Sequence, residues 1–242
     1  MTATPAAESI AEPAGLARPA CLLNAGVAWF GVLLTAFLSG MGWYDDLPPE
    51  PGLYGGRPYG AAGAAGRLFD TFSYFTIWSN VVVAVSVTLL LARPLRASLA
   101  RRVLRLDGLL MITVTAIVYQ LLLAPSAVIT GWSRLTDPIL HIVTPVVTLA
   151  VWLGWGPRGW VTLRMVPLAL VVPVLWIGWM LARGAVTDTY PYDFVNVSAH
   201  GYGSVTLTLL MILVFGLVVT AVLWAVEALL GRRRTRTVAA EA

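Results

Sequence analysis

Polar side chains occur at helical spacing within two otherwise apolar stretches of the sequence. Ser73, Thr76 and Asn80 recur at i, i+3 and i+7, which places them on one face of a helix. In a second stretch Asp137 and His141 are four residues apart, which is one helical turn. Polar side chains inside a membrane are costly, so these residues are the first candidates for a functional site.

Thr76 and His141 could together carry out acyl transfer. A threonine hydroxyl is a weak nucleophile and needs a base within hydrogen-bond reach, and histidine is the usual base. Thr76 would attack an ester carbonyl, while His141 would take up the hydroxyl proton and return it to the leaving alcohol. Thr76 lies six residues after Asp70 and His141 four after Asp137, so at about 1.5 Å per residue both lie at a similar depth. Helix-terminal N–H groups or Asn80 could stabilise the oxyanion, and Asp137 either caps a helix or orients His141.

Each of these residues also has a structural interpretation. The Thr76 hydroxyl could bond back to the carbonyl one turn earlier, as is common in membrane helices. His141 could belong to a specific buried pair without chemistry. His200, which precedes Gly201 in a loop, could be a plain surface or interfacial residue.

The loop before the last apolar stretch collects aromatic and polar residues. Tyr190, Tyr192, Asp193 and His200 could line a substrate site or form its lid, or they could belong to an interfacial aromatic belt. A zinc site is a further alternative. Its candidate ligands are His141, His200, Asp137, Asp188 and Asp193. We expect no metal, because nothing in the sequence shows that these ligands converge, and no cofactor, because phosphate-loop, dinucleotide-binding and haem-attachment motifs are absent.

Composition shows which elements must position these residues. Of the 242 residues 58% are hydrophobic and 12% are charged, whereas soluble domains have roughly 25% charged residues. A soluble globular protein is therefore excluded. Stretches of about 20 predominantly apolar residues predict six membrane-spanning helices. Their approximate ranges are 20–41, 72–92, 107–127, 138–155, 163–182 and 203–230.

The sequence thus predicts an all-α polytopic membrane protein, a bundle of six transmembrane helices over residues 20–230. Residues 1–19 are expected to form a disordered tail and residues 231–242 a basic tail. The loop at 42–71 is rich in proline and has a Gly/Ala stretch at 60–66, which predicts no long regular element. The one cysteine, Cys21, excludes an internal disulfide and is expected to pack as a small apolar residue.

Arginine supplies all of the basic charge, with 16 residues and no lysine, and its distribution predicts the orientation. Short cytoplasmic loops retain basic residues during insertion. Twelve of the 16 fall at one set of helix ends, namely Arg18, Arg93, Arg96, Arg101, Arg102, Arg105, Arg158, Arg164, Arg232, Arg233, Arg234 and Arg236. Both termini are therefore predicted to be cytoplasmic, in the plasma membrane of a bacterium, with the candidate site near the outer leaflet.

Three segments resemble, in the same order, elements of one membrane family. They are Phe72–Asn80 (FSYFTIWSN), Leu140–Pro145 (LHIVTP) and Thr189–Asp193 (TYPYD), the last running into the final apolar stretch. Over about residues 70–230 the chain resembles the androgen-induced and androgen-dependent TFPI-regulating proteins and their bacterial membrane relatives. It departs from the animal proteins in its long first outer loop and at Trp78, Ser79 and Asn80, where the animal proteins often have an acidic residue.

This resemblance implies a threonine hydrolase of fatty acid esters of hydroxy fatty acids, with Thr76 as nucleophile and His141 as base. The sequence therefore predicts an integral membrane hydrolase of lipid esters, whose partners are membrane lipids and a lipid-ester substrate. Nucleic acid is not expected as a partner, because no polar domain could hold it. The alternative is a non-catalytic protein that binds or transports a lipid or small molecule in an outward-facing pocket.

Overall fold

The computed structural model describes residues 17–45, 50–94 and 98–241, with side chains described as far as residue 231. Six stretches of helix in it are long and apolar enough to cross a membrane, as the sequence predicts. The elements are α1 (Ala17–Met41), α2 (Gly60–Thr71), α3 (Phe75–Ala92), α4 (Leu99–Val118), η1 (Tyr119–Leu123), α5 (Ser133–Pro138), η2 (Ile139–Val143), α6 (Thr144–Trp155), η3 (Leu163–Met165), η4 (Pro167–Leu170), α7 (Val171–Thr187), η5 (Asp193–Val195) and α8 (Val197–Glu241). The protein is an all-α multi-pass membrane protein.

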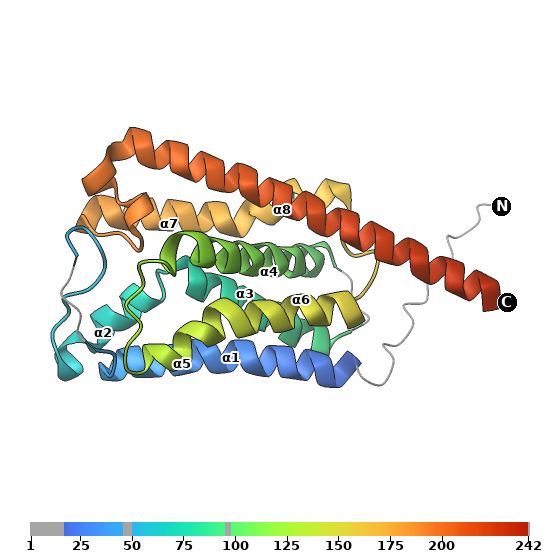
Figure 1. The fold of residues 1–242 in the computed structure, drawn as a ribbon, viewed down its shortest axis with the longest axis horizontal. Coiled ribbons are helices and arrows are strands. Elements are labelled where there is room, and N and C mark those ends of the chain that lie inside the picture. The colour runs from blue at the N-terminus through green and yellow to red at the C-terminus, as the bar shows by residue number, and fades with distance from the viewer. Residues whose placement is uncertain (1–16, 46–49, 95–97, 242) are drawn as a thin grey trace.

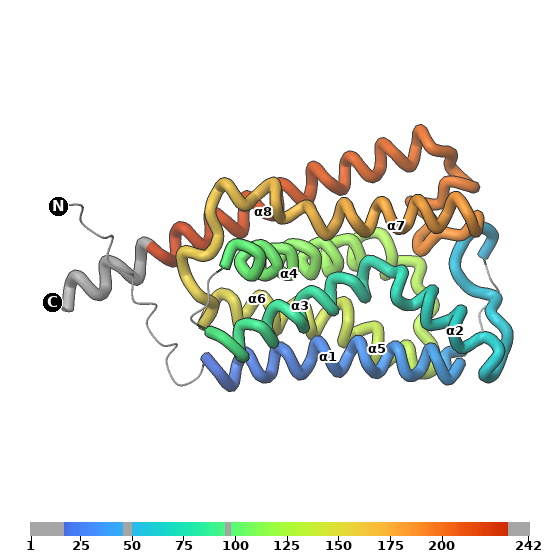
Figure 2. The backbone as a smooth tube through the Cα atoms, turned by 180° about the vertical axis from the view of Figure 1, so that it is seen from behind, coloured from blue at the N-terminus to red at the C-terminus, as the bar shows by residue number. Residues whose placement is uncertain are grey.

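The long helices lie side by side in one bundle (Figure 1). Helix α4 runs through the middle, with α1, α3 and α6 on one side of it and α7 and α8 on the other, and the reverse view agrees (Figure 2). The central position of α4 matches its burial, since Leu106, Leu109 and Met111 are fully enclosed. We call the end that holds the start of α1 and the end of α8 the terminal end, and the opposite end, which holds α2, the loop end.

Helix α2 corrects one expectation. The Gly/Ala stretch at 60–66 was expected to form no long regular element, but α2 is a helix of 12 residues. Alanine has the highest helix propensity, and the bare α-carbon of Gly63 lets the Pro58 carbonyl approach closely. Arg67 of α2 then donates hydrogen bonds to the carbonyls of Ser39 and Gly40 at the end of α1, at 2.7 and 2.9 Å. These bonds satisfy carbonyls that a helix end leaves without partners.

Element boundaries change the interpretation of three segments. Helix α1 begins at Ala17, so residues 17–19, expected in the tail, belong to the first helix, while residues 1–16 lie outside the described chain. Helix α8 continues to Glu241, through most of the expected basic tail, and residue 242 is not described. Helix α3 begins at Phe75, so Ser73 lies in the turn before it and not on the helical face that its spacing predicts.

Two spans contain a π-helical turn, in which backbone hydrogen bonds reach five residues back. These are η1, which continues α4, and η2, which lies between α5 and α6. In both, the residue after the turn donates its N–H five residues back, and a proline without an N–H comes next, Pro125 or Pro145. Both turns therefore begin six residues before a proline. Such turns occur frequently at functional sites.

The structure confirms that Cys21 packs as a small apolar residue. The thiol is buried in an apolar cluster that includes Val83, Ala84 and Val87 of α3 and Ile112 of α4. It therefore contributes to the packing between α1, α3 and α4, as a small apolar side chain does.

Candidate active site

Thr76 and His141 meet at the loop end of the bundle. Thr76 is the second residue of α3, His141 lies in the π turn η2, and Thr76 Oγ1 is 3.2 Å from His141 Nε2. Threonines in mid-helix behave differently, since Thr88 and Thr113 donate to carbonyls four residues back. Because Thr76 lies at the start of its helix, the residue four positions earlier is not helical. The Thr76 hydroxyl therefore contacts the His141 imidazole instead of a carbonyl one turn back.

Asp137 holds the His141 ring from the other side. His141 Nδ1 is 3.1 Å from Asp137 Oδ1 and 3.1 Å from the Asp137 backbone carbonyl. Both oxygens can only accept, so Nδ1 carries the proton and Nε2 presents its lone pair to Thr76. Of the two roles considered for Asp137, the contacts match the orienting one, because this residue lies inside α5 and not at its cap.

Tyr119 completes this group. Its hydroxyl donates to Asp137 Oδ2, and its ring stacks on the His141 imidazole with 4.0 Å between the ring centroids. The imidazole is therefore fixed both at its edge, by Asp137, and at its face, by Tyr119. Sequence reasoning missed Tyr119. The signal that could have indicated it is Pro125, six residues later, because η2 also begins six residues before a proline.

Tyr192 contacts the candidate nucleophile directly. Its hydroxyl oxygen is 3.3 Å from Thr76 Oγ1 and 3.4 Å from the Thr76 backbone nitrogen. Since the Thr76 hydroxyl proton points to His141, the phenol donates to Oγ1 and accepts from the N–H. Burial raises the pKa of Tyr192 to about 12, so the phenol stays protonated at neutral pH and can donate to an oxyanion. The sequence predicted Tyr192 only as a substrate or lid residue.

Asn80 has a different place from the one suggested by its spacing. Its Nδ2 donates to the carbonyls of Thr76 and Leu140, at 2.8 and 3.3 Å, so the amide is not directed at an oxyanion beside Thr76. The Leu140 carbonyl needs this partner, because Thr144 donates to Ile139 and the next residue, a proline, has no N–H. Asn80 therefore ties the start of α3 to the π turn that carries His141.

Two further predicted residues hold the surrounding backbone. Ser73 donates to the Phe69 carbonyl at 2.7 Å and accepts from Trp179 Nε1 at 3.3 Å, and it does not contact Thr76. Tyr190 is buried, and its N–H donates to the Gly52 carbonyl at 2.8 Å. Ser73 thus fixes the turn before α3. Tyr190 joins the loop between α1 and α2 to the connection between α7 and α8.

The remaining candidates lie elsewhere. His200 Nε2 is 3.2 Å from Asp193 Oδ2, and both side chains are exposed. The two histidines therefore have separate carboxylate partners, Asp137 for His141 and Asp193 for His200. In the part of the chain that the structure describes, no group of three or more His, Cys, Asp and Glu side chains is placed to share a metal ion.

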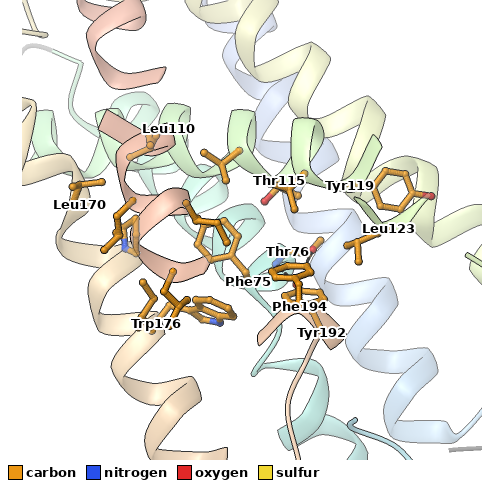
Figure 3. A pocket seen from close by; sticks show the side chains of 18 residues that line it. Phe75, Thr76, Leu110, Thr115, Tyr119, Leu123, Leu170, Trp176, Tyr192 and Phe194 are labelled. Carbon is orange, nitrogen blue, oxygen red and sulfur yellow. Dashed lines mark hydrogen bonds between the residues drawn. The ribbon is translucent and has the colours of Figure 1, made fainter. Parts of the chain in front are cut away.

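A cavity lies beside Thr76, between α3, α4, α7 and α8 (Figure 3). The space free of atoms along its walls is about 690 Å³, a figure that includes space open to the surroundings, so the cavity is not closed. Among its lining side chains, Thr115, Tyr119 and Trp176 direct their polar groups to protein partners. Thr76 and Tyr192 also line the cavity, with their hydroxyls in contact with each other, and the other walls are apolar. The site therefore combines a hydroxyl–imidazole pair with a space suited to a hydrocarbon chain.

Comparison with family models, curated proteins and solved structures finds no match to this chain. The family resemblance therefore rests on the three short segments quoted above. The structure brings together the two residues that the resemblance implies, Thr76 and His141, and adds Asp137, Tyr119 and Tyr192 around them.

Proposed function

We propose that this protein is an intramembrane hydrolase of lipid esters that forms an acyl-enzyme on Thr76. The observation that carries the proposal is the 3.2 Å contact between Thr76 Oγ1 and His141 Nε2, with Asp137 Oδ1 3.1 Å from the far ring nitrogen. This order of hydroxyl, imidazole and carboxylate is the arrangement that activates a weak nucleophile.

The mechanism follows from these contacts. His141 Nε2 removes the Thr76 hydroxyl proton as Oγ1 attacks the ester carbonyl carbon, and Asp137 stabilises the resulting imidazolium. The Tyr192 hydroxyl and the Thr76 N–H, at the positive end of α3, stabilise the oxyanion. The C–O bond to the alcohol breaks, and the alcohol leaves with the proton from His141. Water then attacks the acyl-threonine by the same route, which releases the acid and restores Thr76.

The proposed substrate is a lipid ester that enters from the outer leaflet of a bacterial plasma membrane. The apolar cavity beside Thr76 supports an acyl substrate. Orientation is supported by arginine, since Arg93, Arg101 and Arg102 lie at the terminal end and only four arginines belong to loop-end segments. By the bias of basic residues toward the cytoplasm, the terminal end with both chain termini is cytoplasmic, and the site faces outward.

Ester turnover by the purified protein in detergent tests this function. Thr76→Ala is expected to lower kcat/KM at least about a thousandfold, and Thr76→Ser to retain measurable turnover because it keeps the hydroxyl. Thr113→Ala is the matched control, since that hydroxyl bonds back to Leu109 within α4. Full activity in Thr76→Ala would contradict the proposal.

A second candidate function is ligand binding without chemistry. The apolar cavity favours it as well, because such a space would hold a lipid chain whether or not a bond is cleaved. It predicts that fatty acids or lipid esters raise the thermal unfolding midpoint of the wild type without any ester turnover.

A further inference from the structure

The cavity beside Thr76 has a definite direction. Along α8 its lining residues extend from Leu209 to Gly216, and along α4 from Val118 to Leu110, while Tyr119 and Leu123 of η1 continue the wall beyond Val118 on the side of Thr76. At about 1.5 Å per helical residue these stretches are roughly 10–12 Å long. Thr76, Tyr192 and Phe194 stand together on one side in Figure 3, and Leu110 and Leu170 lie at the opposite end. The cavity therefore runs from the candidate nucleophile toward the middle of the bundle.

Gly216 lies at the far end of this cavity. A Cβ added there would lie 3.4 Å from Leu170 Cδ2 and 3.8 Å from Leu110 Cδ1. These distances are ordinary packing contacts, so the three residues converge, and a longer side chain at position 216 would extend into the remaining space. Glycine in a helix interior is unfavourable, and here it keeps the end of the cavity open by the volume of one side chain.

The position of His141 indicates which part of an ester would occupy the cavity. Thr76 lines the cavity, but His141 does not, and it reaches Thr76 Oγ1 from the α6 side. The leaving alcohol takes its proton from His141, so it must lie on that side of Thr76. The acyl group, which stays bonded to Oγ1, is then left facing the cavity.

We infer that the cavity is the acyl-chain site and that Gly216, with Leu110 and Leu170, sets the longest acyl chain accepted. This inference rests on the proposed hydrolase function. An extended chain advances about 1.2 Å per single bond, as an extended polypeptide does, so 10–12 Å holds about ten carbons. The substrate class is accordingly an ester of an unbranched medium-chain acid, with the alcohol part free to vary.

The test uses p-nitrophenyl esters of unbranched acids from about four to about sixteen carbons, with the full-length protein in detergent. For the wild type, kcat/KM is expected to rise about threefold to fourfold per added methylene up to about ten carbons, and then to stop rising. Gly216→Leu should lower kcat/KM for the ten-carbon ester at least about tenfold and leave kcat/KM for the four-carbon ester within about twofold of the wild type. Gly216→Ala, which adds an ordinary contact, should shift the limit by about one carbon and guards against misfolding of the leucine variant.

Gly178→Leu is the matched control, because Gly178 of α7 has no atom within 4 Å of its Cβ position and does not line the cavity. Its chain-length profile should equal that of the wild type. A second series with a fixed acyl group and alcohols of increasing length should respond equally in the wild type and Gly216→Leu. An unchanged acyl profile in Gly216→Leu, or a change confined to the alcohol series, overturns the inference.

Thermal unfolding with free fatty acids of the same lengths separates the two proposals, because it requires no turnover. In the wild type, the rise in the thermal midpoint should increase with chain length up to about ten carbons. In Gly216→Leu it should stop increasing at a shorter chain length. That result without ester turnover would overturn the hydrolase function while supporting the chain site. Ester turnover, together with equal stabilisation by fatty acids in the wild type and Gly216→Leu, would overturn the chain site alone.

Discussion

Buried polar residues gather at both ends of the bundle, and the two groups differ in how they are connected. At the terminal end Arg105, Asp107 and Glu227 are almost fully enclosed, and each has at least one side-chain atom with no hydrogen-bond partner among the described residues. At the loop end Asn80 Oδ1 and Arg183 Nε also lack partners among the described residues, but Thr76 Oγ1 contacts His141, and both ring nitrogens of His141 have partners. Burial of polar groups alone therefore does not distinguish the two ends, whereas the connected chain of donors and acceptors around His141 does.

The cavity adds a second difference between the ends. Thr76 lines it, while Arg105, Asp107 and Glu227 do not. The terminal-end charges instead join elements, since Arg158 Nη1 is 3.3 Å from Glu227 Oε2 and so ties the segment after α6 to α8. These contacts give the terminal-end group a packing role, and the chemistry proposed above belongs to the loop-end group.

The largest effect that separates the two histidines is expected from His141→Gln. Loss of the base should lower kcat/KM at least about a thousandfold, and combining it with Thr76→Ala should cost little more, because the two groups act as a unit. His200→Gln should retain full ester turnover, since the exposed His200–Asp193 pair touches neither Thr76 nor the cavity. Equal losses in both variants would remove the distinction between His141, beside Thr76, and the exposed His200.

Tyr192→Phe should have the next largest effect. Removal of one oxyanion donor is expected to lower kcat about a hundredfold with little change in KM, as judged from initial rates. Tyr202→Phe, at an exposed tyrosine of α8, is the control and should behave as the wild type. A change in KM alone would show that Tyr192 serves only to bind the substrate.

Tyr192 also predicts a dependence of stability on pH. Its pKa in the folded protein is about 12, above its ordinary value of 10, because burial disfavours the phenolate. The folded state thus binds more protons in this window, so this contribution is complete below about pH 10 and is lost as the pH rises toward 12. The thermal midpoint should fall across that window, and the fall should be smaller in Tyr192→Phe than in Tyr202→Phe.

Asn80→Leu is expected to have a smaller effect on turnover. Loss of the bond to the Leu140 carbonyl leaves a buried acceptor unpaired, which costs about 1–3 kcal/mol and loosens the link between α3 and η2. We expect kcat to fall about tenfold. Asn24→Leu, which removes the bond between Asn24 and Thr148, should lose stability without this loss of kcat. Equal kcat in the two variants would show that Asn80 stabilises the fold but does not position the site.

The smallest effect is expected at the terminal end. Arg105→Met replaces a buried cation with an apolar side chain of similar length. Nε and Nη1 of Arg105 have no hydrogen-bond partner among the described residues. A buried charge that is not paired costs free energy, so the thermal midpoint should stay the same or rise, and ester turnover should stay within about twofold. A large loss of turnover would mean that the terminal-end group belongs to the site.

Sequence reasoning reached the six spans and the Thr76–His141 pair because both depend on local patterns. Apolar length predicts the spans, and helical rise places the two residues at one depth. The contacts of Tyr192 and Asn80 could not be predicted, since they depend on how separate helices pack and on which carbonyls a π turn leaves free. Helix α2 was not predicted because glycine is typical of loops. The alanines between its glycines favour the helix.

Identification of the modified residue tests the central claim most directly. The protein would be treated with an alkyl fluorophosphonate, digested, and the adduct located by mass spectrometry. The proposed mechanism predicts one adduct per chain on Thr76, retained in Thr113→Ala and lost in both Thr76→Ala and His141→Gln. An adduct on any other residue, or undiminished labelling of Thr76→Ala, would contradict Thr76 as the nucleophile.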